Sequence, residues 1–132
     1  MMAGLLLSTA AAIADDLTAA DRFLCSASLA TVCSTDGTCA SEPPWKLDIP
    51  QFMEVDLAEK TLSTTEASGE NRSTPIKNLE REEGLIILQG YENGRAFSFV
   101  IAEEDGMTSI AVARDGLSVA VFGACTPMPS SS

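Results

Sequence analysis

The sequence predicts an all-β protein: a small antiparallel up-and-down barrel or a compact sandwich of about eight strands, with a C-terminal meander. Apolar and polar residues alternate along several short segments, as they do in half-buried strands. Four cysteines in a chain of 132 residues favour a small domain stabilised by disulfides. We favour the barrel, because its closure would leave no free edge on the last predicted strand, 117–125.

The first part of the domain gives weaker signals. Residues 15–20 are expected to form a frayed lead-in or a short helix, and the small, apolar residues 22–33 one or two strands. Two prolines then interrupt the chain. Beyond them, apolar and charged residues alternate over 45–49, which predicts a half-buried strand. We expect Trp45 to pack in the core of this strand rather than to stack on a ligand.

The middle of the chain predicts a hairpin followed by a connector. Apolar and acidic residues alternate over 53–57, and residues 62–64 can pair back onto this strand. Residues 66–73 are polar and are expected to form a mobile loop. Because Pro75 has no N–H to donate within a sheet, the segment 73–79 is expected to be an edge strand or a connector.

Three dipeptides divide the region from residue 85 to residue 125: Asn93-Gly94, Asp105-Gly106 and Asp115-Gly116. Each is typical of a two-residue hairpin turn, in which both central residues have positive φ. Such loops predict the cross-strand pairs Gly90–Phe97, Leu88–Phe99, Ile86–Ile101, Ile101–Ile110, Phe99–Val112, Val112–Val119 and Ile110–Val121. The three turns agree on one face, which we expect to be the core: Ile86, Leu88, Phe97, Phe99, Ile101, Ile110, Val112, Val119 and Val121. Gly90 would leave room for the Phe97 ring.

The opposite face of the meander carries small, uncharged residues, whereas a solvated face usually carries charge. Its members are Leu85, Ile87, Gln89, Tyr91, Ala96, Ser98, Val100, Ala102, Ser109, Ala111, Ala113, Ser118, Ala120, Phe122 and Ala124. We expect another strand layer, the N-terminal segment, a ligand or a partner to cover it, and favour cover by the chain itself. The candidate binding face is Ile87, Tyr91, Val100, Ala111, Ala120 and Phe122. Arg95 is expected at the surface, where it supports the turn with Tyr91.

Four cysteines allow three pairings. A three-residue loop at 35–37, with Gly37 left-handed, would place Cys33 opposite Cys39. Cys125 falls on the core face of the last strand, where Cys25 could close the first strand onto it. We therefore predict the disulfides Cys33–Cys39 and Cys25–Cys125.

The first 14 residues, MMAGLLLSTAAAIA, are apolar and end in an A-x-A pattern, which is typical of a signal peptide. The alternative is a buried N-terminal strand or helix. A signal peptide predicts export, with a periplasmic or extracellular location. The remaining chain divides into one disulfide-bonded β domain, 15–125, and a disordered tail, 126–132, which contains two prolines and three serines.

Charge restricts the expected partners. The chain has 19 acidic and 8 basic residues and a net charge of −11. An acidic chain without a basic stripe is a poor nucleic-acid binder. The apolar N-terminal stretch is shorter than the roughly 20 residues of a membrane span. The partners that we expect are a cationic protein or a small apolar ligand.

The residues needed for common catalytic chemistry are absent. Without histidine there is no Ser-His-Asp or Cys-His triad and no imidazole metal ligand. The cysteine spacings fit neither a zinc site nor a CxxC redox centre. The dense carboxylate clusters, 80–83 and 103–105, fall at predicted hairpin ends, where solvated charge is usual. We therefore expect no enzyme activity, no metal site and no cofactor.

An export signal, disulfides, about eight strands and acidic charge together are similar to the plan of the small periplasmic inhibitors of C-type lysozyme. Those families carry a Ser-Gly-x-x-Tyr motif near a loop. The nearest stretch here, 89–94, reads Gln-Gly-Tyr-Glu-Asn-Gly and lacks it, so no functional residue is transferred. The predicted function is that of an exported, soluble, non-catalytic binding or accessory module. The alternatives are an acidic inhibitor of a basic cell-wall hydrolase and a barrel that carries a small ligand.

Overall fold

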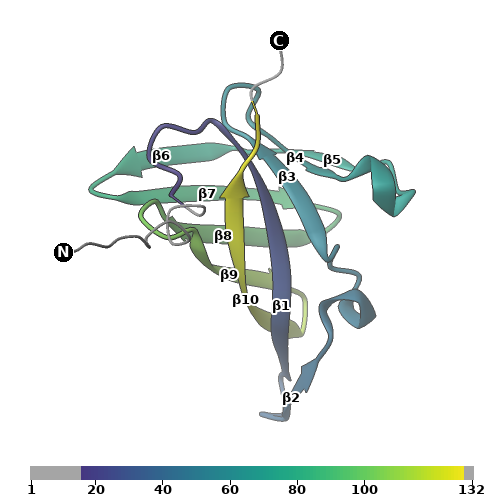
Figure 1. Cartoon of the computed structure of the whole chain (residues 1–132). Helices are drawn as coiled ribbons and strands as arrows, with labels where there is room; N and C mark the ends of the chain where they lie inside the picture. The colour runs from purple at the N-terminus through teal and green to yellow at the C-terminus, as the bar shows by residue number, and fades with distance from the viewer. Residues whose placement is uncertain (1–15, 130–132) are drawn as a thin grey trace, which may run out of the picture.

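A computed structural model describes residues 16–129 of the protein (Figure 1). The predicted signal peptide, 1–14, lies outside the described residues. The strands are β1 (Arg22–Ser34), β2 (Cys39–Glu42), β3 (Phe52–Asp56), β4 (Thr61–Thr64), β5 (Ser73–Pro75), β6 (Asn78–Glu82), β7 (Leu85–Glu92), β8 (Arg95–Ala102), β9 (Met107–Arg114) and β10 (Leu117–Pro127). Two short 3-10 helices, η2 (Pro44–Leu47) and η3 (Glu66–Ser68), interrupt them. The predicted all-β class is confirmed.

The strands form one antiparallel sheet in the order β5-β4-β3-β1-β10-β9-β8-β7-β6, and β2 extends it by pairing with β1. The sheet curls into a half-barrel, so that β6 to β8 cross behind β1 and β10 in Figure 1. Because β1 pairs along β10, the last strand has no free edge, as the barrel prediction required. Residues 22–33 form one strand, and the hairpin predicted at 53–64 is formed by β3 and β4.

The two end strands of the sheet, β5 and β6, are consecutive in the chain, and only Ile76 and Lys77 separate them. The Ile76 N–H donates to the Lys60 carbonyl (2.9 Å), next to β4, and the Lys77 N–H donates to the Gln89 carbonyl (2.8 Å) on β7. This short crossing therefore links both ends of the curled sheet. It also explains why Pro75 is tolerated, since the chain changes pairing partner there.

The first and third turns of the meander have the predicted register, and the second does not. Across Asn93-Gly94, Gly90 faces Phe97, and across Asp115-Gly116, Val112 faces Val119. In the second hairpin the loop has four residues, Glu103–Gly106, so Ile101 pairs with Thr108 instead of Ile110. By the same shift of two residues, Phe99 pairs with Ile110 instead of Val112. A shift of two keeps every side chain on its face.

The longer loop has a physical reason, because its carbonyl groups serve other segments. The Glu103 carbonyl accepts a hydrogen bond from the Leu17 N–H (2.7 Å), and the Gly106 carbonyl accepts one from the Cys125 N–H (2.8 Å). The Gly106 N–H donates back to the Ala102 carbonyl (2.8 Å) and closes the loop. A two-residue turn would lack these contacts.

The predicted core face forms the concave, inner side of the curl. Ile86, Leu88, Ile101 and Val121 are fully buried, and the larger set includes partly buried residues packed against them: Phe97, Ile110 and Val112. A Cβ on Gly90 would lie 2.6 Å from Phe97 Cζ, so this glycine does make room for the ring.

Four predictions for the ends and the proline segment are wrong. Residues 44–47 form a 3-10 helix rather than a strand, because Pro43 and Pro44 start a turn that ends at left-handed Asp48 (φ 59°). Trp45 is consequently 60% exposed and not part of the core. Disorder from residue 126 is also wrong, since β10 continues to Pro127, which pairs with Phe23; residues 130–132 lie outside the described residues. Finally, the lead-in is anchored, because Leu17 is fully buried.

Candidate functional site

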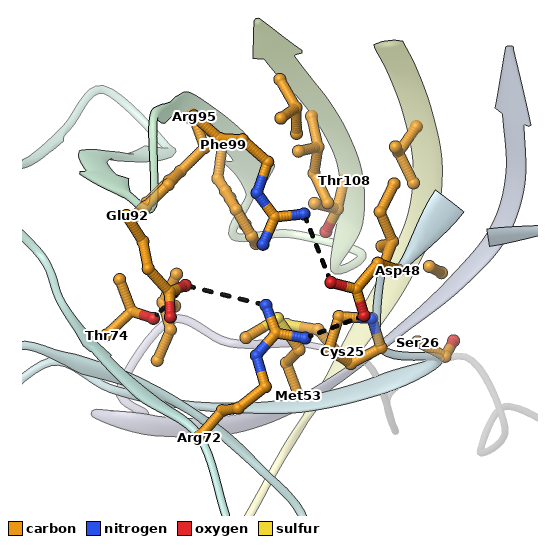
Figure 2. Close-up of a pocket in the computed structure, with 18 residues that line it drawn as sticks. Cys25, Ser26, Asp48, Met53, Arg72, Thr74, Glu92, Arg95, Phe99 and Thr108 are labelled. Carbon is orange, nitrogen blue, oxygen red and sulfur yellow. Dashed lines mark hydrogen bonds and ion pairs between the residues drawn. The ribbon is translucent and has the colours of Figure 1, made fainter. Parts of the chain in front are cut away.

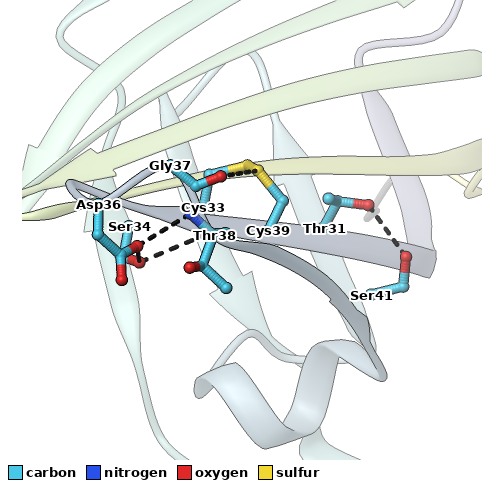
Figure 3. Close-up of a disulfide and its surroundings, with 8 residues drawn as sticks. All are labelled: Thr31, Cys33, Ser34, Asp36, Gly37, Thr38, Cys39 and Ser41. Atoms are coloured by element: carbon cyan, nitrogen blue, oxygen red, sulfur yellow. Dashed lines mark hydrogen bonds between the residues drawn. A yellow bond between two sulfur atoms is a disulfide. The ribbon is translucent and has the colours of Figure 1, made fainter.

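Both predicted disulfides are present. Cys25 and Cys125 face each other on β1 and β10 (Cα–Cα 3.9 Å) and are buried, so this bond joins two residues that are 100 positions apart in the chain. Cys33–Cys39 closes the hairpin between β1 and β2 (Figure 3). In that hairpin Asp36 accepts hydrogen bonds from the Thr38 N–H (2.9 Å) and the Ser34 hydroxyl (2.8 Å). These bonds hold the pKa of Asp36 below its usual value of 3.8.

The candidate binding face lies on the convex, outer side of the curl. Tyr91 is 63% exposed, Phe122 51% and Val100 39%; Ala111 and Ala120 are also exposed, and Ile87 is half-buried. The expectation that the chain itself covers this face is wrong for the described residues, because none of residues 16–129 seals it. The face also does not line the barrel interior, so it cannot be the wall of a ligand cavity.

The outer face is free of charge across several strands. One row of paired residues runs Phe122–Ser109–Val100–Ile87, and the next runs Ala120–Ala111–Ser98–Gln89. Leu29 on β1 pairs with Phe122 and continues the first row. Charge returns at the β6 edge, where the exposed Glu80 and Glu82 pair with Ile87 and Leu85, and beside Tyr91, where the Lys77 ammonium group lies over the ring.

A cavity of about 90 Å³ lies inside the curl, against the predicted core face (Figure 2). Its wall is mostly apolar and includes Met53, Leu62, Phe97, Phe99, Ile110, Val112 and Val121. Two threonines also line it, and both have partners: Thr74 donates to Glu92 Oε1 (2.7 Å) and Thr108 to the Gly106 carbonyl (3.0 Å). No buried side-chain nitrogen or oxygen within residues 16–129 lacks a hydrogen-bond partner. The interior therefore offers apolar contact to a guest.

Four charged residues surround the mouth of this cavity: Asp48, Arg72, Glu92 and Arg95 (Figure 2). Glu92 and Arg95 are paired positions flanking the Asn93-Gly94 turn, and both line the inside of the curl. Arg72 precedes β5, and Asp48 follows η2. Arg72 lies 3.6 Å from Asp48 and 3.7 Å from Glu92, and Arg95 lies 3.9 Å from Asp48.

This mouth was not predicted from the sequence. Arg95 was expected at the surface beside Tyr91, but its side chain is only 17% exposed and lines the cavity, whereas Tyr91 points outward beneath the Lys77 ammonium group (5.3 Å to the ring centroid). One signal was available. Glu92 and Arg95 are in the same register as the core residues, so charged side chains at these positions must point into the curl at its rim.

A second hollow of about 400 Å³ adjoins the mouth and shares Asp48 with it. The exposed aromatic residues Trp45 and Phe52 lie on its wall, together with Glu70. Glu70 forms an ion pair with Arg72 (3.6 Å), so a charged residue of the hollow interacts directly with one of the mouth.

The carboxylate clusters do not converge on either hollow. Glu103 forms a 2.6 Å ion pair with Arg81, which also binds the carbonyl groups of Leu17 and Thr18 and so anchors the lead-in. Glu80, Glu82 and Glu83 are exposed. Over residues 16–129, no three His, Cys, Asp or Glu side chains are grouped so that they could hold a metal ion. Within the same range, no helix has the length and apolar character to cross a membrane.

Fold and cavity define a class: a small, disulfide-bonded antiparallel half-barrel with an apolar interior and a charged mouth. No family model, curated protein or solved structure matches the chain.

Proposed function

We propose that this protein is a non-catalytic binding protein that holds a small apolar molecule inside its half-barrel. The observation that carries the proposal is the cavity of about 90 Å³, whose wall is mostly apolar and whose threonine hydroxyls are already hydrogen-bonded. The free energy of binding to an interior of this kind is favourable for apolar guests and only slightly favourable for polar ones.

The size of the cavity limits the guest. A cavity of about 150 Å³ is large enough for benzene, so a cavity of about 90 Å³ suits an alkyl chain of four or five carbons. Burial contributes about 0.8 kcal/mol for each CH2 group, or about 3–4 kcal/mol for such a chain. The resulting affinity is weak for a bare alkyl chain, and further contacts at the mouth would have to increase it.

Two further features support the proposal of a non-catalytic, exported protein. The mouth carboxylates, Asp48 and Glu92, are each paired with arginine, and the chain has no histidine to act as a base. The two disulfides favour an oxidising compartment, such as the periplasm or the extracellular space.

Calorimetric titration with 1-pentanol tests this function. We expect saturable binding to the unaltered protein and a loss of at least about tenfold in affinity for Val112→Phe, because the added ring fills the cavity. Val100→Phe is the matched control, since it makes the same change on the outer face of the same sheet. Equal affinities for the two variants, or no binding of 1-pentanol to the unaltered protein, would contradict the proposal.

The charge-free outer face favours a second role: we propose that two copies of the chain associate through it. A net charge of −11 makes two copies repel each other, and this uncharged surface is where they can approach most closely. Five strands about 4.8 Å apart and about 27 Å long form a face of at most about 650 Å². A dimer would bury at most this area on each copy, which is somewhat below the usual value of about 800 Å² per partner. Association is therefore expected to be weak.

Sedimentation equilibrium tests the second role. The protein should form dimers that Ala111→Lys dissociates, because a lysine at the centre of the face would be buried opposite a second lysine. Ala58→Lys, in the exposed loop between β3 and β4, should leave the dimers intact. A protein that stays monomeric up to millimolar concentration, or dimers that tolerate Ala111→Lys, would refute this role.

A further inference from the structure

We infer that the guest of the cavity carries a carboxylate, and that Arg95 receives it. The inference rests on the proposed function and adds the chemical class of the ligand: a short alkyl or similarly small apolar carboxylate. The observation behind it is the state of the Arg95 guanidinium group. This side chain is only 17% exposed, yet among the described residues its one polar partner is Asp48, at 3.9 Å.

That separation is too long for a hydrogen bond, which requires about 3.5 Å or less between the heavy atoms. A guanidinium group carries five N–H donors. Those of Arg95 make no hydrogen bond to the described residues and stay in contact with water, because no water-excluded side-chain nitrogen among these residues lacks a partner. Arg95 therefore has unused donors at the entrance of an apolar cavity.

Arg81 is an arginine of the same molecule whose donors do have protein acceptors. It is more exposed than Arg95, at 26%, and still makes contacts of 2.6 Å with Glu103, 2.8 Å with the Leu17 carbonyl and 3.2 Å with Asp21. Arg95 is more buried and has no protein acceptor within hydrogen-bonding distance, so its donors remain available to a ligand. The difference between these two arginines points to an anion that completes the Arg95 site.

Asp48 is the residue that such an anion would replace. Its side chain is 79% exposed and lies between Arg95 (3.9 Å) and Arg72 (3.6 Å), as Figure 2 shows. A ligand carboxylate that displaced the Asp48 side chain into solvent would keep the net charge of the mouth unchanged. It could also bind the Arg95 fork through two hydrogen bonds.

The position of Arg95 matches the cavity beneath it. Arg95 lies two residues before Phe97, and both residues line the cavity. A carboxylate at Arg95 thus places its alkyl chain directly over the apolar wall. Glu92 flanks Arg72 on the other side (3.7 Å) and would repel a second negative charge, so the site favours monocarboxylates.

Titrations with pentanoate and 1-pentanol at pH 7 test the inference, because these probes share the alkyl chain and differ in the charged group. Pentanoate should bind the unaltered protein at least about tenfold more tightly than 1-pentanol. Arg95→Gln should lower pentanoate affinity at least about tenfold and change 1-pentanol affinity less than about twofold. Arg114→Gln, at an exposed position at the end of β9, is the matched control and should change neither.

Asp48→Asn provides a test in the opposite direction. Asparagine tolerates the left-handed backbone of this position, and it removes the competing carboxylate. It should raise pentanoate affinity at least about threefold and leave 1-pentanol binding unchanged.

The outcomes separate the inference from the proposed function. If 1-pentanol binds in the cavity but pentanoate binds no more tightly, or if Arg95→Gln weakens both probes equally, the carboxylate inference is wrong and the proposed function stands. If neither probe binds, both are wrong.

Discussion

Gly90 on β7 allows the Phe97 ring to lie across it, and a side chain at this position would meet that ring. A Cβ would lie 2.6 Å from Phe97 Cζ and 3.0 Å from the Pro75 carbonyl oxygen. We predict that Gly90→Ala lowers the free energy of unfolding by about 1–3 kcal/mol, as overpacked cores do. Urea denaturation measures the change.

Phe97→Leu supplies the control for this prediction. If the ring is the main obstacle, the double variant Gly90→Ala/Phe97→Leu should lose at least about 1 kcal/mol less than the two single losses added together. Strictly additive losses would show that the ring is not the cause.

Asp36 makes the hairpin between β1 and β2 sensitive to acid. The Thr38 N–H and the Ser34 hydroxyl lower the pKa of Asp36, so the stabilisation that they provide is complete above pH 3.8 and is lost as the pH falls through the lower, folded-state pKa. A carbon-detected NMR titration should find the Asp36 carboxylate titrating below 3.8. The Thr38 amide shift should follow the same curve and lose this step in Asp36→Asn. An Asp36 pKa at or above the usual value would contradict the hydrogen-bonded geometry.

Residue-scale patterns predicted some contacts well and others poorly. Gly90 opposite Phe97 followed from register alone, because cross-strand neighbours are set by the turn between them. Trp45 was misplaced, since the alternation over 45–49 also fits a 3-10 turn whose backbone is decided by Pro43 and Pro44. Periodicity over five residues cannot distinguish these two structures.

The two disulfides close loops of very different length, so their removal should lower the free energy of unfolding by different amounts. Cys25–Cys125 closes a separation of 100 residues and Cys33–Cys39 one of 6. Loop-closure entropy assigns them about 4.7 and about 2.4 kcal/mol, respectively. Denaturant unfolding of Cys25→Ala/Cys125→Ala and Cys33→Ala/Cys39→Ala should therefore give the larger loss for the first pair. A larger loss for the second pair would mean that chain entropy does not dominate.

At the scale of elements, the loop length of the middle hairpin could not be predicted from its local sequence. Asp105-Gly106 has the composition of a two-residue turn, but the loop is Glu103–Gly106, because Leu17 and Cys125 use its carbonyl groups. Those donors come from the two ends of the chain. A turn whose length depends on distant partners cannot be read from its own dipeptide.

At the scale of the whole molecule, the curl and its closure were predictable, and the mouth of the cavity was not. Three independent turns agreed on the inner face, and the pairing of the first strand with the last followed from the cysteines. The mouth joins Asp48, Arg72 and the pair Glu92–Arg95, which come from separate segments of the chain. Only the folded sheet brings such side chains together.

The acidic charge of the whole molecule is the basis for the prediction that it inhibits a basic cell-wall hydrolase. A net charge of −11 would speed association with a cationic hydrolase at low salt. If the hypothesis is right, the purified protein should slow bacterial lysis by a basic lysozyme, and added salt should reduce the effect. Unchanged lysis at low salt would exclude it for that enzyme.

The central claim is that a small apolar molecule enters the half-barrel, and methyl NMR tests it most directly. During a titration with 1-pentanol, the methyl signals of Ile110 and Val121, on the cavity wall, should shift and saturate together. Those of Ile87 and Val100, on the outer face, should stay unchanged. Saturable shifts confined to the outer face, or no shifts in the interior at any concentration reached, would contradict the account.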